Sequence, residues 1–202
     1  MRLENGERSG FRINVDGTYL SKESGFQTAD VEIRNKDSIF VNIELTSPRN
    51  NKIGPVFMED NLVFTLESGV EQKINLNAYS WDADIVKNLR IKGDTVISSD
   101  RPIVIYGDMR IDSSATARIV PGTTLYFHSG AKLDVYGRLL AEGTADKNIT
   151  FRGDRTDRMF DYLPYDMVSG QWNGIHFHSS SYENIMSYTD THSTFNGIVC
   201  DS

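Results

Sequence analysis

Short apolar triplets recur through the second half of the chain, and this repeat constrains the fold more than any other feature. The first residues of successive triplets lie 22, 24, 26 and 23 positions apart. Each triplet is apolar at its outer positions and variable in the middle, as expected of a strand with one buried face. A period in the low twenties is typical of a solenoid, in which each turn buries its inner face against its neighbours. The triplets are Ile103-Val104-Ile105, Leu125-Tyr126-Phe127, Ile149-Thr150-Phe151, Ile175-His176-Phe177 and Ile198-Val199-Cys200.

Gly, Ser, Asp and Thr separate these triplets, which favours a parallel β-helix over a helical repeat. A second row supports the first, because Met109-Arg110-Ile111 and Leu133-Asp134-Val135 lie 24 positions apart. We expect Ile185 two turns beyond Leu133 in this second row. The alternation places Ile103, Leu125, Phe127, Ile149, Phe151, Ile175, Phe177 and Ile198 in the core, and Val104, Tyr126, Thr150, His176 and Val199 outside.

Residues 1–83 have the pattern of a small antiparallel β-sandwich. Residues 11–15 alternate and run into a turn at Asp16-Gly17. Residues 31–33 and 39–45 predict one hairpin around Asn35-Lys36-Asp37, and residues 62–66 and 74–78 predict another across Ser68-Gly69. About five strands can be counted, fewer than the roughly seven of an immunoglobulin-like sandwich. We therefore expect leading strands to be missing from this domain.

The β-helix is expected over residues 94–202, with residues 84–93 as a junction. Residues 152–172 interrupt the repeat with aspartates, arginines and aromatic side chains. Such departures in solenoids become loops on one face, often the binding face. The last triplet ends two residues before the end of the sequence, so we expect the β-helix to be truncated there.

Several stretches in this order resemble one family of bacterial proteins. They are Ser9-Gly10-Phe11-Arg12-Ile13-Asn14-Val15-Asp16-Gly17, Leu125-Tyr126-Phe127-His128, Val135-Tyr136-Gly137, Ala141-Glu142-Gly143-Thr144, Phe151-Arg152-Gly153-Asp154-Arg155, and Tyr165-Asp166-Met167-Val168-Ser169-Gly170-Gln171-Trp172 followed by Asn173-Gly174-Ile175. Together they resemble right-handed parallel β-helix proteins that are predicted surface lipoproteins of Bacteroidetes-type bacteria.

The resemblance implies an immunoglobulin-like domain followed by a right-handed β-helix, exported and lipid-anchored at the extracellular or outer-membrane surface. This sequence departs from the family pattern because it lacks the leader, the anchoring cysteine and the first sandwich strands. No catalytic residues come with the resemblance.

Composition limits the function classes. A net charge of −7 argues against general nucleic-acid binding, which needs a basic face. No run of 18 apolar residues occurs, so we expect no membrane span in this chain. The single cysteine, Cys200, excludes an intrachain disulfide framework and is expected to be a small buried hydrophobe.

The insertion at 152–172 is the best candidate site. Tyr and Trp rings stack on sugars, while Asp and Arg hydrogen-bond hydroxyl or acidic groups, so a polysaccharide or other surface glycan is the candidate partner. The alternative, which the pattern favours, is that the rings pin the loop to the solenoid flank while the charges stay solvated. The candidate ligand-binding residues are Arg155, Asp157, Asp161, Tyr162, Tyr165, Asp166 and Trp172, with Tyr126 and His176 on the neighbouring outer strand face.

Catalysis is the competing hypothesis. The alternative is a polysaccharide lyase or glycoside hydrolase of the β-helix type whose catalytic coils are partly missing here. Such enzymes need clustered carboxylates or a carboxylate–base pair, and a glycosidase needs two carboxyl groups at a defined separation, for which Asp154, Asp157 and Asp161 are candidates. Fold analogy alone supports this weakly. His176 and His178 share a strand face and would bind a metal only if a third ligand joined them, so solvated histidines are favoured and no metal or cofactor is expected.

The sequence therefore predicts an all-β, non-catalytic extracellular or cell-surface scaffold or glycan-interaction protein. We also expect self-association through the exposed terminal coil, where residues 197–200 would have a stacking partner on one side only.

Overall fold

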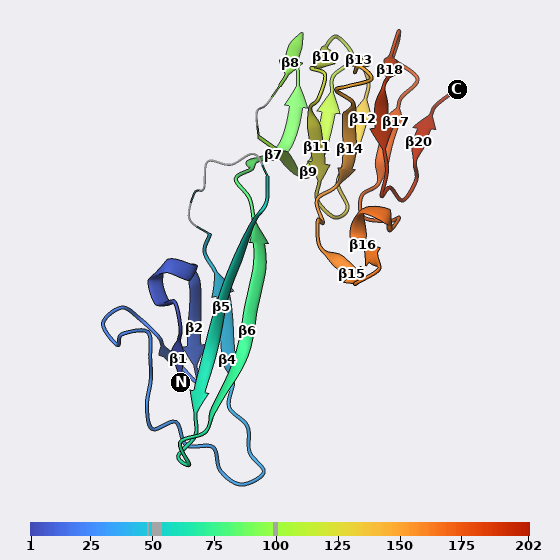
Figure 1. Cartoon of the computed structure of the whole chain (residues 1–202). Coiled ribbons are helices and arrows are strands. Elements are labelled where there is room, and N and C mark those ends of the chain that lie inside the picture. The colour runs from blue at the N-terminus through green and yellow to red at the C-terminus, as the bar shows by residue number, and fades with distance from the viewer. Residues whose placement is uncertain (48, 50–53, 99–100) are drawn as a thin grey trace. The chain divides into compact units, whose positions relative to one another are not determined.

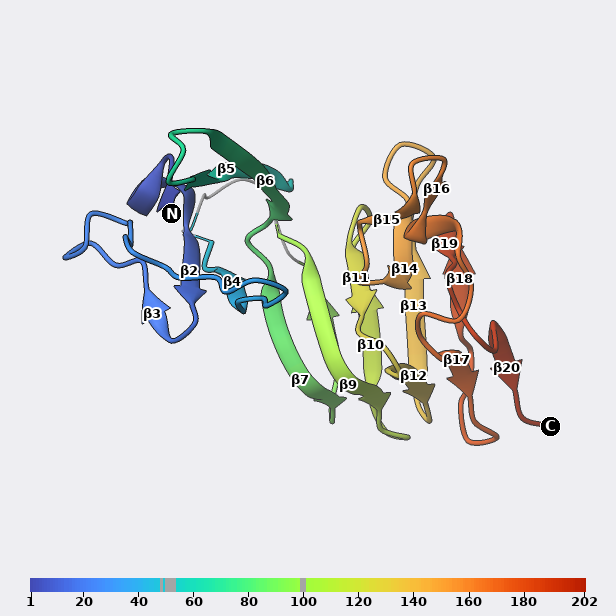
Figure 2. The same ribbon diagram turned by 90° about the horizontal axis from the view of Figure 1, so that it is seen from below.

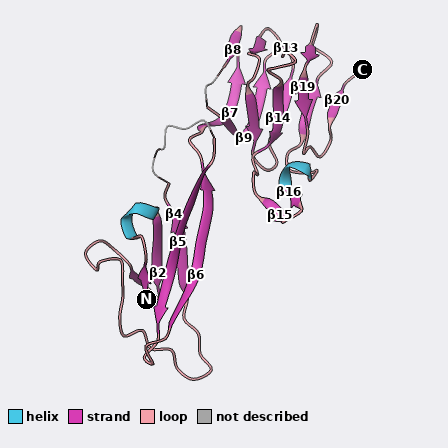
Figure 3. Cartoon of the chain, in the orientation of Figure 1, coloured by secondary structure: helices cyan, strands magenta, loops and turns pink. Residues whose placement is uncertain are grey.

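The computed structural model describes residues 1–47, 49, 54–98 and 101–202 and divides the chain into two compact units, Met1–Asp82 and Ala83–Ser202. Strands account for about half of the residues, and Figure 3 shows only short helical turns beside them. The class is therefore all-β, as the sequence predicts, and the second unit is a parallel β-solenoid of about 5 turns.

The first unit is a sandwich of two three-stranded antiparallel sheets, ordered β1-β5-β6 and β3-β2-β4. Its buried core draws on both sheets, with Ile13 on β2 and Leu62 on β5 almost fully buried. The elements are β1 (Arg2–Leu3), the 3₁₀ turn η1 (Gly6–Ser9), β2 (Phe11–Val15), β3 (Thr18–Tyr19), β4 (Val41–Leu45), β5 (Val56–Thr65) and β6 (Glu71–Ser80).

One of the two predicted hairpins forms in this unit, and so does the predicted turn at Asp16-Gly17. Strands β2 and β3 meet across Asp16-Gly17, where both residues take positive φ, and β5 pairs with β6 along its whole length. The hairpin predicted around Asn35-Lys36-Asp37 is wrong. Residues 31–33 form no strand, and β4 pairs with β2 instead. A local turn does close there, with the Asp37 amide donating to the Arg34 carbonyl at 3.0 Å, but its arms do not pair.

The second unit winds its strands into three parallel stacks, each one face of the solenoid (Figures 1 and 2). The strands are β7 (Asp84–Ile91), β8 (Thr95–Ile97), β9 (Ile103–Ile111), β10 (Thr116–Ile119), β11 (Thr124–Phe127), β12 (Lys132–Val135), β13 (Arg138–Glu142), β14 (Ile149–Gly153), β17 (Gly174–Phe177), β18 (Ile185–Ser187), β19 (Thr189–Thr191) and β20 (Ile198–Cys200).

We number the stacks by their place in each coil. The first stack contains the leading halves of β7 and β9, then β11, β14 and β19. The second contains the trailing halves of β7 and β9, then β12, β17 and β20. The third contains β8, β10, β13 and β18. The three inner faces enclose one continuous apolar core.

Most of the predicted core is confirmed. Seven of the eight side chains expected inside are no more than 9% exposed. Ile198 is the exception at 51%, because β20 pairs with β17 on one side only. Cys200 on the same strand is also exposed, contrary to expectation. Val104, expected outside, is buried, and its register neighbours Ile85 and Tyr126 flank it in the outer row.

The five triplets do not form a single ladder, which corrects the register expected from spacing. Ile103 and Leu125 pair in the first stack, but the next partner of Leu125 is Phe151 and not Ile149. Ile175 and Ile198 belong to the second stack, above Leu133. The five triplets are nearly evenly spaced along the sequence although they belong to two stacks, because the insertion lengthens one coil. Ile185 likewise joins the third stack beside Leu140, and not the row of Leu133.

The predicted junction at 84–93 is also wrong in part, because β7 forms the first solenoid coil there. Asn88 takes φ 49° and interrupts the strand, so Val86 and Leu89 both pack on the core although they are three residues apart. Because of this irregularity, apolar residues in β7 do not alternate strictly with polar ones, and the sequence does not show the two-residue period of a strand. Gly107, with φ 75°, makes the corresponding bend in β9.

Candidate functional site

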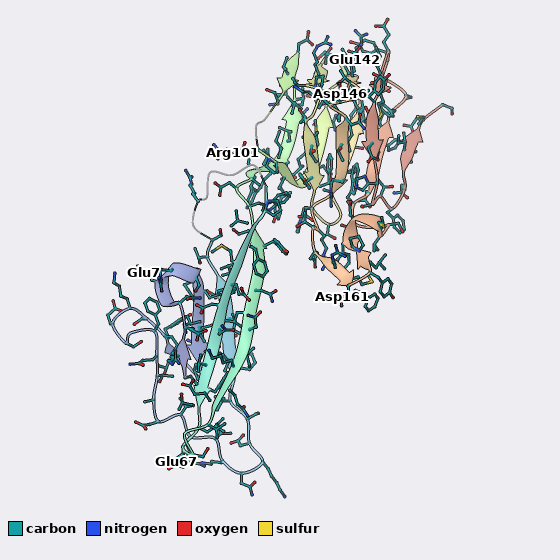
Figure 4. All side chains as sticks on the ribbon, in the orientation of Figure 1. Glu7, Glu67, Arg101, Glu142, Asp146 and Asp161 are labelled. Atoms are coloured by element: carbon teal, nitrogen blue, oxygen red, sulfur yellow. The ribbon has the colours of Figure 1, made fainter. Side chains whose placement is uncertain are left out.

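The insertion lies between β14 and β17, where the chain passes from the first stack to the second. It forms a short antiparallel hairpin of β15 (Arg158–Phe160) and β16 (Leu163–Pro164), then the 3₁₀ turn η2 (Tyr165–Met167). All three residues of β15 are exposed, so the hairpin adds nothing to the core. Figure 4 labels Asp161 at its turn. The prediction of a loop departing from the solenoid is confirmed.

Two aromatic rings form an exposed pair at the hairpin tip. Phe160 is 54% exposed and Tyr162 is 80% exposed. Their centroids lie 5.6 Å apart with planes inclined by 11°, so the two rings stack. The Arg158 guanidinium donates to the Asp161 carbonyl at 2.6 Å and closes the turn between them. We call Phe160 and Tyr162 the tip pair.

The base of the insertion is held by a second arrangement of charges and rings. The Arg155 guanidinium lies 3.3 Å from the centroid of the Tyr165 ring, and its Nε donates to Asp157 at 3.0 Å. This hydrogen bond from Arg155 lowers the pKa of the Asp157 carboxyl. The Tyr165 amide also donates to the Asp157 carbonyl at 3.0 Å. These three predicted site residues therefore lie together, but they bind one another.

Trp172 is a core residue, which corrects its place among the predicted ligand contacts. Its side chain is buried and stacks on Phe127, with centroids 4.2 Å apart and planes inclined by 9°. Its indole Nε1 donates to the His192 carbonyl at 2.9 Å, so its polar atom is satisfied as well. No face of this ring is open to a ligand. Trp172 anchors the insertion where the chain returns to the solenoid.

A polar groove of about 490 Å³ lies beside the insertion. Asp166 from η2 accepts from Arg152 at 2.8 Å and from His192 Nε2 at 2.7 Å. The other ring nitrogen of His192 lies 3.2 Å from Asp190 on β19. We call this the polar groove; its lining residues are Asp166, Met167, Ser169, Asp190, His192, Ser193 and Thr194.

Tyr126 joins this region through Arg152. The two residues are register neighbours on β11 and β14, and the Arg152 guanidinium carbon lies 5.3 Å from the centroid of the Tyr126 ring. Burial raises the pKa of the Tyr126 hydroxyl. The prediction that Tyr126 lies near the insertion therefore fits the structure. Asp190 and His192 were missed because they come from the following coil, whose stacking position the sequence spacing does not reveal.

His176 lies in the second stack, and so the predicted site does not form one surface. It projects from β17 beside Asp134, its register partner, and His178. Burial acts to raise the pKa of Asp134, but hydrogen bonds from His178 and Lys132 outweigh it and hold the pKa below its usual range. His176 and His178 were expected to be solvated for want of a third ligand. Asp134 now supplies a third donor.

The fold and these sites define a parallel β-solenoid that carries an exposed aromatic hairpin and follows a small β-sandwich unit. No protein-family model, curated protein or solved structure matches this chain. Within the described residues, the helical segments are too short to cross a membrane.

Proposed function

We propose that this chain is a non-catalytic glycan-binding protein whose insertion presents the tip pair and lines part of the polar groove. The exposure of the tip pair carries the proposal. Phe160 and Tyr162 are far more exposed than packing requires, and they lie on a hairpin without buried side chains. Aromatic faces presented in this way stack on the apolar faces of sugar rings.

The polar groove complements the tip pair. Carboxylates of Asp166 and Asp190 can accept hydrogen bonds from sugar hydroxyl groups, and the hydroxyl groups of Ser169, Ser193 and Thr194 line the same groove. The chain carries a net charge of −7, and two carboxylates line the groove. Both features disfavour strongly anionic polymers. The proposed ligand class is therefore neutral polysaccharide.

The affinity expected of such a site is low. An aromatic contact contributes about 0.5–1.5 kcal/mol beyond simple burial. Two stacked rings with a few solvated hydrogen bonds give a dissociation constant on the order of 1 mM, which corresponds to roughly 4 kcal/mol. Useful retention of a polymer then depends on many sugar units meeting many copies of the protein.

A glycan array tests this proposal. We expect the parent protein to bind a subset of neutral glycans, and the Phe160→Ser/Tyr162→Ser double variant to lose that binding while keeping its circular dichroism spectrum. A parent protein that binds no glycan at high density would leave the chain as a surface scaffold and overturn the proposal. Preferential binding of uronic-acid polymers would contradict the assigned ligand class.

A polysaccharide-degrading enzyme is the second candidate, because Asp166 and Asp190 both lie against His192 in an open groove. A glycosidase acid needs a raised pKa. Two of the three aspartates proposed from the sequence already have charged or hydrogen-bonded partners, since Asp154 lies 2.6 Å from His128 Nδ1 and Asp157 is paired with Arg155. Release of new reducing ends or unsaturated products from a polysaccharide would establish catalysis and contradict the binding proposal.

A location at the extracellular or outer-membrane surface, with lipid anchoring, is proposed on the family resemblance alone and suits a glycan ligand. Fractionation of the producing cells tests it. Self-association through the edge of β20 also stays a prediction, because among the described strands β20 pairs with β17 alone. Sedimentation that stays monomeric at high concentration would contradict it.

A further inference from the structure

We infer that Asp134, His176 and His178 form a binding site for a divalent transition-metal ion of the zinc class. The site lies in the second stack and does not depend on the proposed glycan function. Nitrogen and oxygen donors of these three side chains all lie within 4.8 Å of one another. Two imidazoles and a carboxylate are a ligand set that zinc, copper and nickel favour.

The strand register brings the three ligands together. Asp134 on β12 and His176 on β17 are direct partners in a parallel ladder, so they project from the same outer row. His178 follows His176 by two positions and therefore points to the same face. Its amide donates to the Val135 carbonyl at 2.9 Å, which fixes the backbone beside Asp134. The solenoid thus positions donors that lie more than forty residues apart in the sequence.

The donor atoms already make short contacts. His178 Nε2 lies 2.8 Å from Asp134 Oδ1, and a metal ion would replace the proton shared between them. Zinc bonds to nitrogen and oxygen of about 2.0–2.2 Å require tetrahedral donors roughly 3.3 Å apart. Binding therefore requires the His178–Asp134 pair to open slightly from 2.8 Å, while any donors farther apart, all now within 4.8 Å, move closer together.

Asp201 supplies a second carboxylate beside the imidazoles. Its Oδ2 lies 3.4 Å from His178 Nδ1, and its Oδ1 lies 2.7 Å from His176 Nε2. A carboxylate on the distal nitrogen orients a metal-bound imidazole and raises its basicity. Asp201 is thus a positioning residue for His178 or a fourth ligand after rotation.

Ring packing limits how the site can move. The His178 ring lies against Tyr136, with centroids 3.8 Å apart and planes inclined by 5°. The His176 ring also lies against the His178 ring, with centroids 4.0 Å apart and planes inclined by 27°. Two imidazoles that share an ion need a larger inclination, so His176 must turn. Its side chain is 33% exposed, against 18% for His178, and has room to do so.

The electrostatic balance also favours a cation. Asp134 and Asp201 bring two negative charges, and Lys132 neutralises one of them through a contact of 2.9 Å to Asp134 Oδ2. The next guanidinium in the row, Arg110, is occupied by Asp112 at 3.0 Å. An incoming divalent ion displaces Lys132 from one carboxylate oxygen and compensates the remaining charge.

Zinc titration of the full chain by calorimetry, in a buffer that does not chelate, tests the inference. We expect the parent to bind one ion per chain, and His176→Asn and His178→Asn each to weaken binding at least about tenfold. The matched control is His128→Asn. His128 makes the same kinds of contact as His178, with its ring 4.2 Å from Tyr106 and its Nδ1 2.6 Å from Asp154, but no second histidine lies beside it among the described residues. This variant should bind zinc as the parent does.

Nuclear magnetic resonance of the histidine rings gives a readout independent of affinity. Zinc should shift the ring signals of His176 and His178 while those of His128 and His192 stay in place. Absence of binding by the parent, unchanged binding by His178→Asn, or equal weakening by His128→Asn would each overturn the inference. Competition by calcium at equal concentration would also contradict it, because calcium prefers oxygen ligands.

Discussion

Trp172 and Tyr162 lie ten positions apart in the same insertion, yet their surroundings assign them opposite roles. Trp172 is 1% exposed and stacks on Phe127, whereas Tyr162 is 80% exposed at the hairpin tip. The sequence predicts both as ligand contacts, because composition alone marks any aromatic ring as a possible surface for stacking on sugars. Trp172 is buried because the insertion rejoins the solenoid at this residue, and the position of that return cannot be read from a single sequence.

Trp172→Ala should therefore lower the free energy of unfolding of the solenoid unit by about 3–5 kcal/mol, as expected for truncating a large buried ring. Urea unfolding followed by circular dichroism measures this change. Tyr162→Ala is the matched control and should leave the midpoint close to that of the parent. Equal losses in the two variants would mean that the hairpin tip packs on the solenoid.

Ionisation of Asp112 should make the stability of the folded chain depend on pH. Hydrogen bonds from Arg90 first, and from Arg110, each at 3.0 Å, hold the pKa of this carboxyl below its usual range in the folded chain. A lowered folded pKa stabilises the protein above the unfolded value, and that contribution is lost as pH falls through the folded value. The melting temperature of the parent should thus fall more steeply below about pH 4 than that of Asp112→Asn.

The measured quantity is the difference in melting temperature between the parent and Asp112→Asn at each pH. It should be constant at neutral pH and shrink in acid. A difference that does not change between pH 6 and pH 2 would show that Asp112 is not stabilised by the two arginines.

At the scale of elements, the corners of the coils decide the register. Gly137 lies between β12 and β13, where a Cβ would meet the Asp112 carbonyl oxygen at 2.2 Å and the Ala115 carbonyl oxygen at 2.3 Å. Both neighbours are backbone atoms, so neither can move without distorting the adjacent coil. Glycine is required here by close approach and not by a positive φ.

Gly137→Ala should cost at least about 1–3 kcal/mol in the free energy of unfolding, the usual range for overpacking. Gly93→Ala is the control within the same unit, because a Cβ at Gly93 meets nothing within 4 Å. Thermal unfolding of both variants measures the difference. Similar melting temperatures for the two would contradict the close stacking of coils at Gly137.

The sequence predicts which side chains of each coil are buried better than it predicts which strands stack on one another. Alternation correctly places Leu125, Phe151 and Ile175 inside because burial of one strand face follows from local pattern alone. It assigns Ile175 to the wrong stack, because the insertion lengthens one coil and mimics a regular period. The same limit explains why His192 and Asp134 were missed as site residues: their neighbours lie in other coils.

At the scale of the whole molecule, the chain has two separate cores. Ile13 is fully buried in the sandwich cluster, and Ile175 is buried in the solenoid cluster, with no residue shared between the clusters. The solenoid core is one-dimensional, since each coil packs on its neighbours, whereas the sandwich core closes between two sheets. Stability should therefore be set separately in each unit.

Differential scanning calorimetry of Ile13→Ala and Ile175→Ala tests this separation. Each truncation should cost about 2–5 kcal/mol and shift one of two transitions while leaving the other in place. A single transition that both substitutions shift together would show that the two units unfold as one cooperative body.

The most direct test of the central claim, that the tip pair binds glycan and does not stabilise the fold, is a paired measurement on Tyr162→Ala. Calorimetric titration with a neutral glycan selected on the array should show binding weakened about two- to tenfold, with the melting temperature unchanged. Tyr182→Ala removes another exposed ring, 47% accessible and outside the insertion, and should leave both quantities as in the parent. Unchanged affinity together with a lowered melting temperature in Tyr162→Ala would contradict the account.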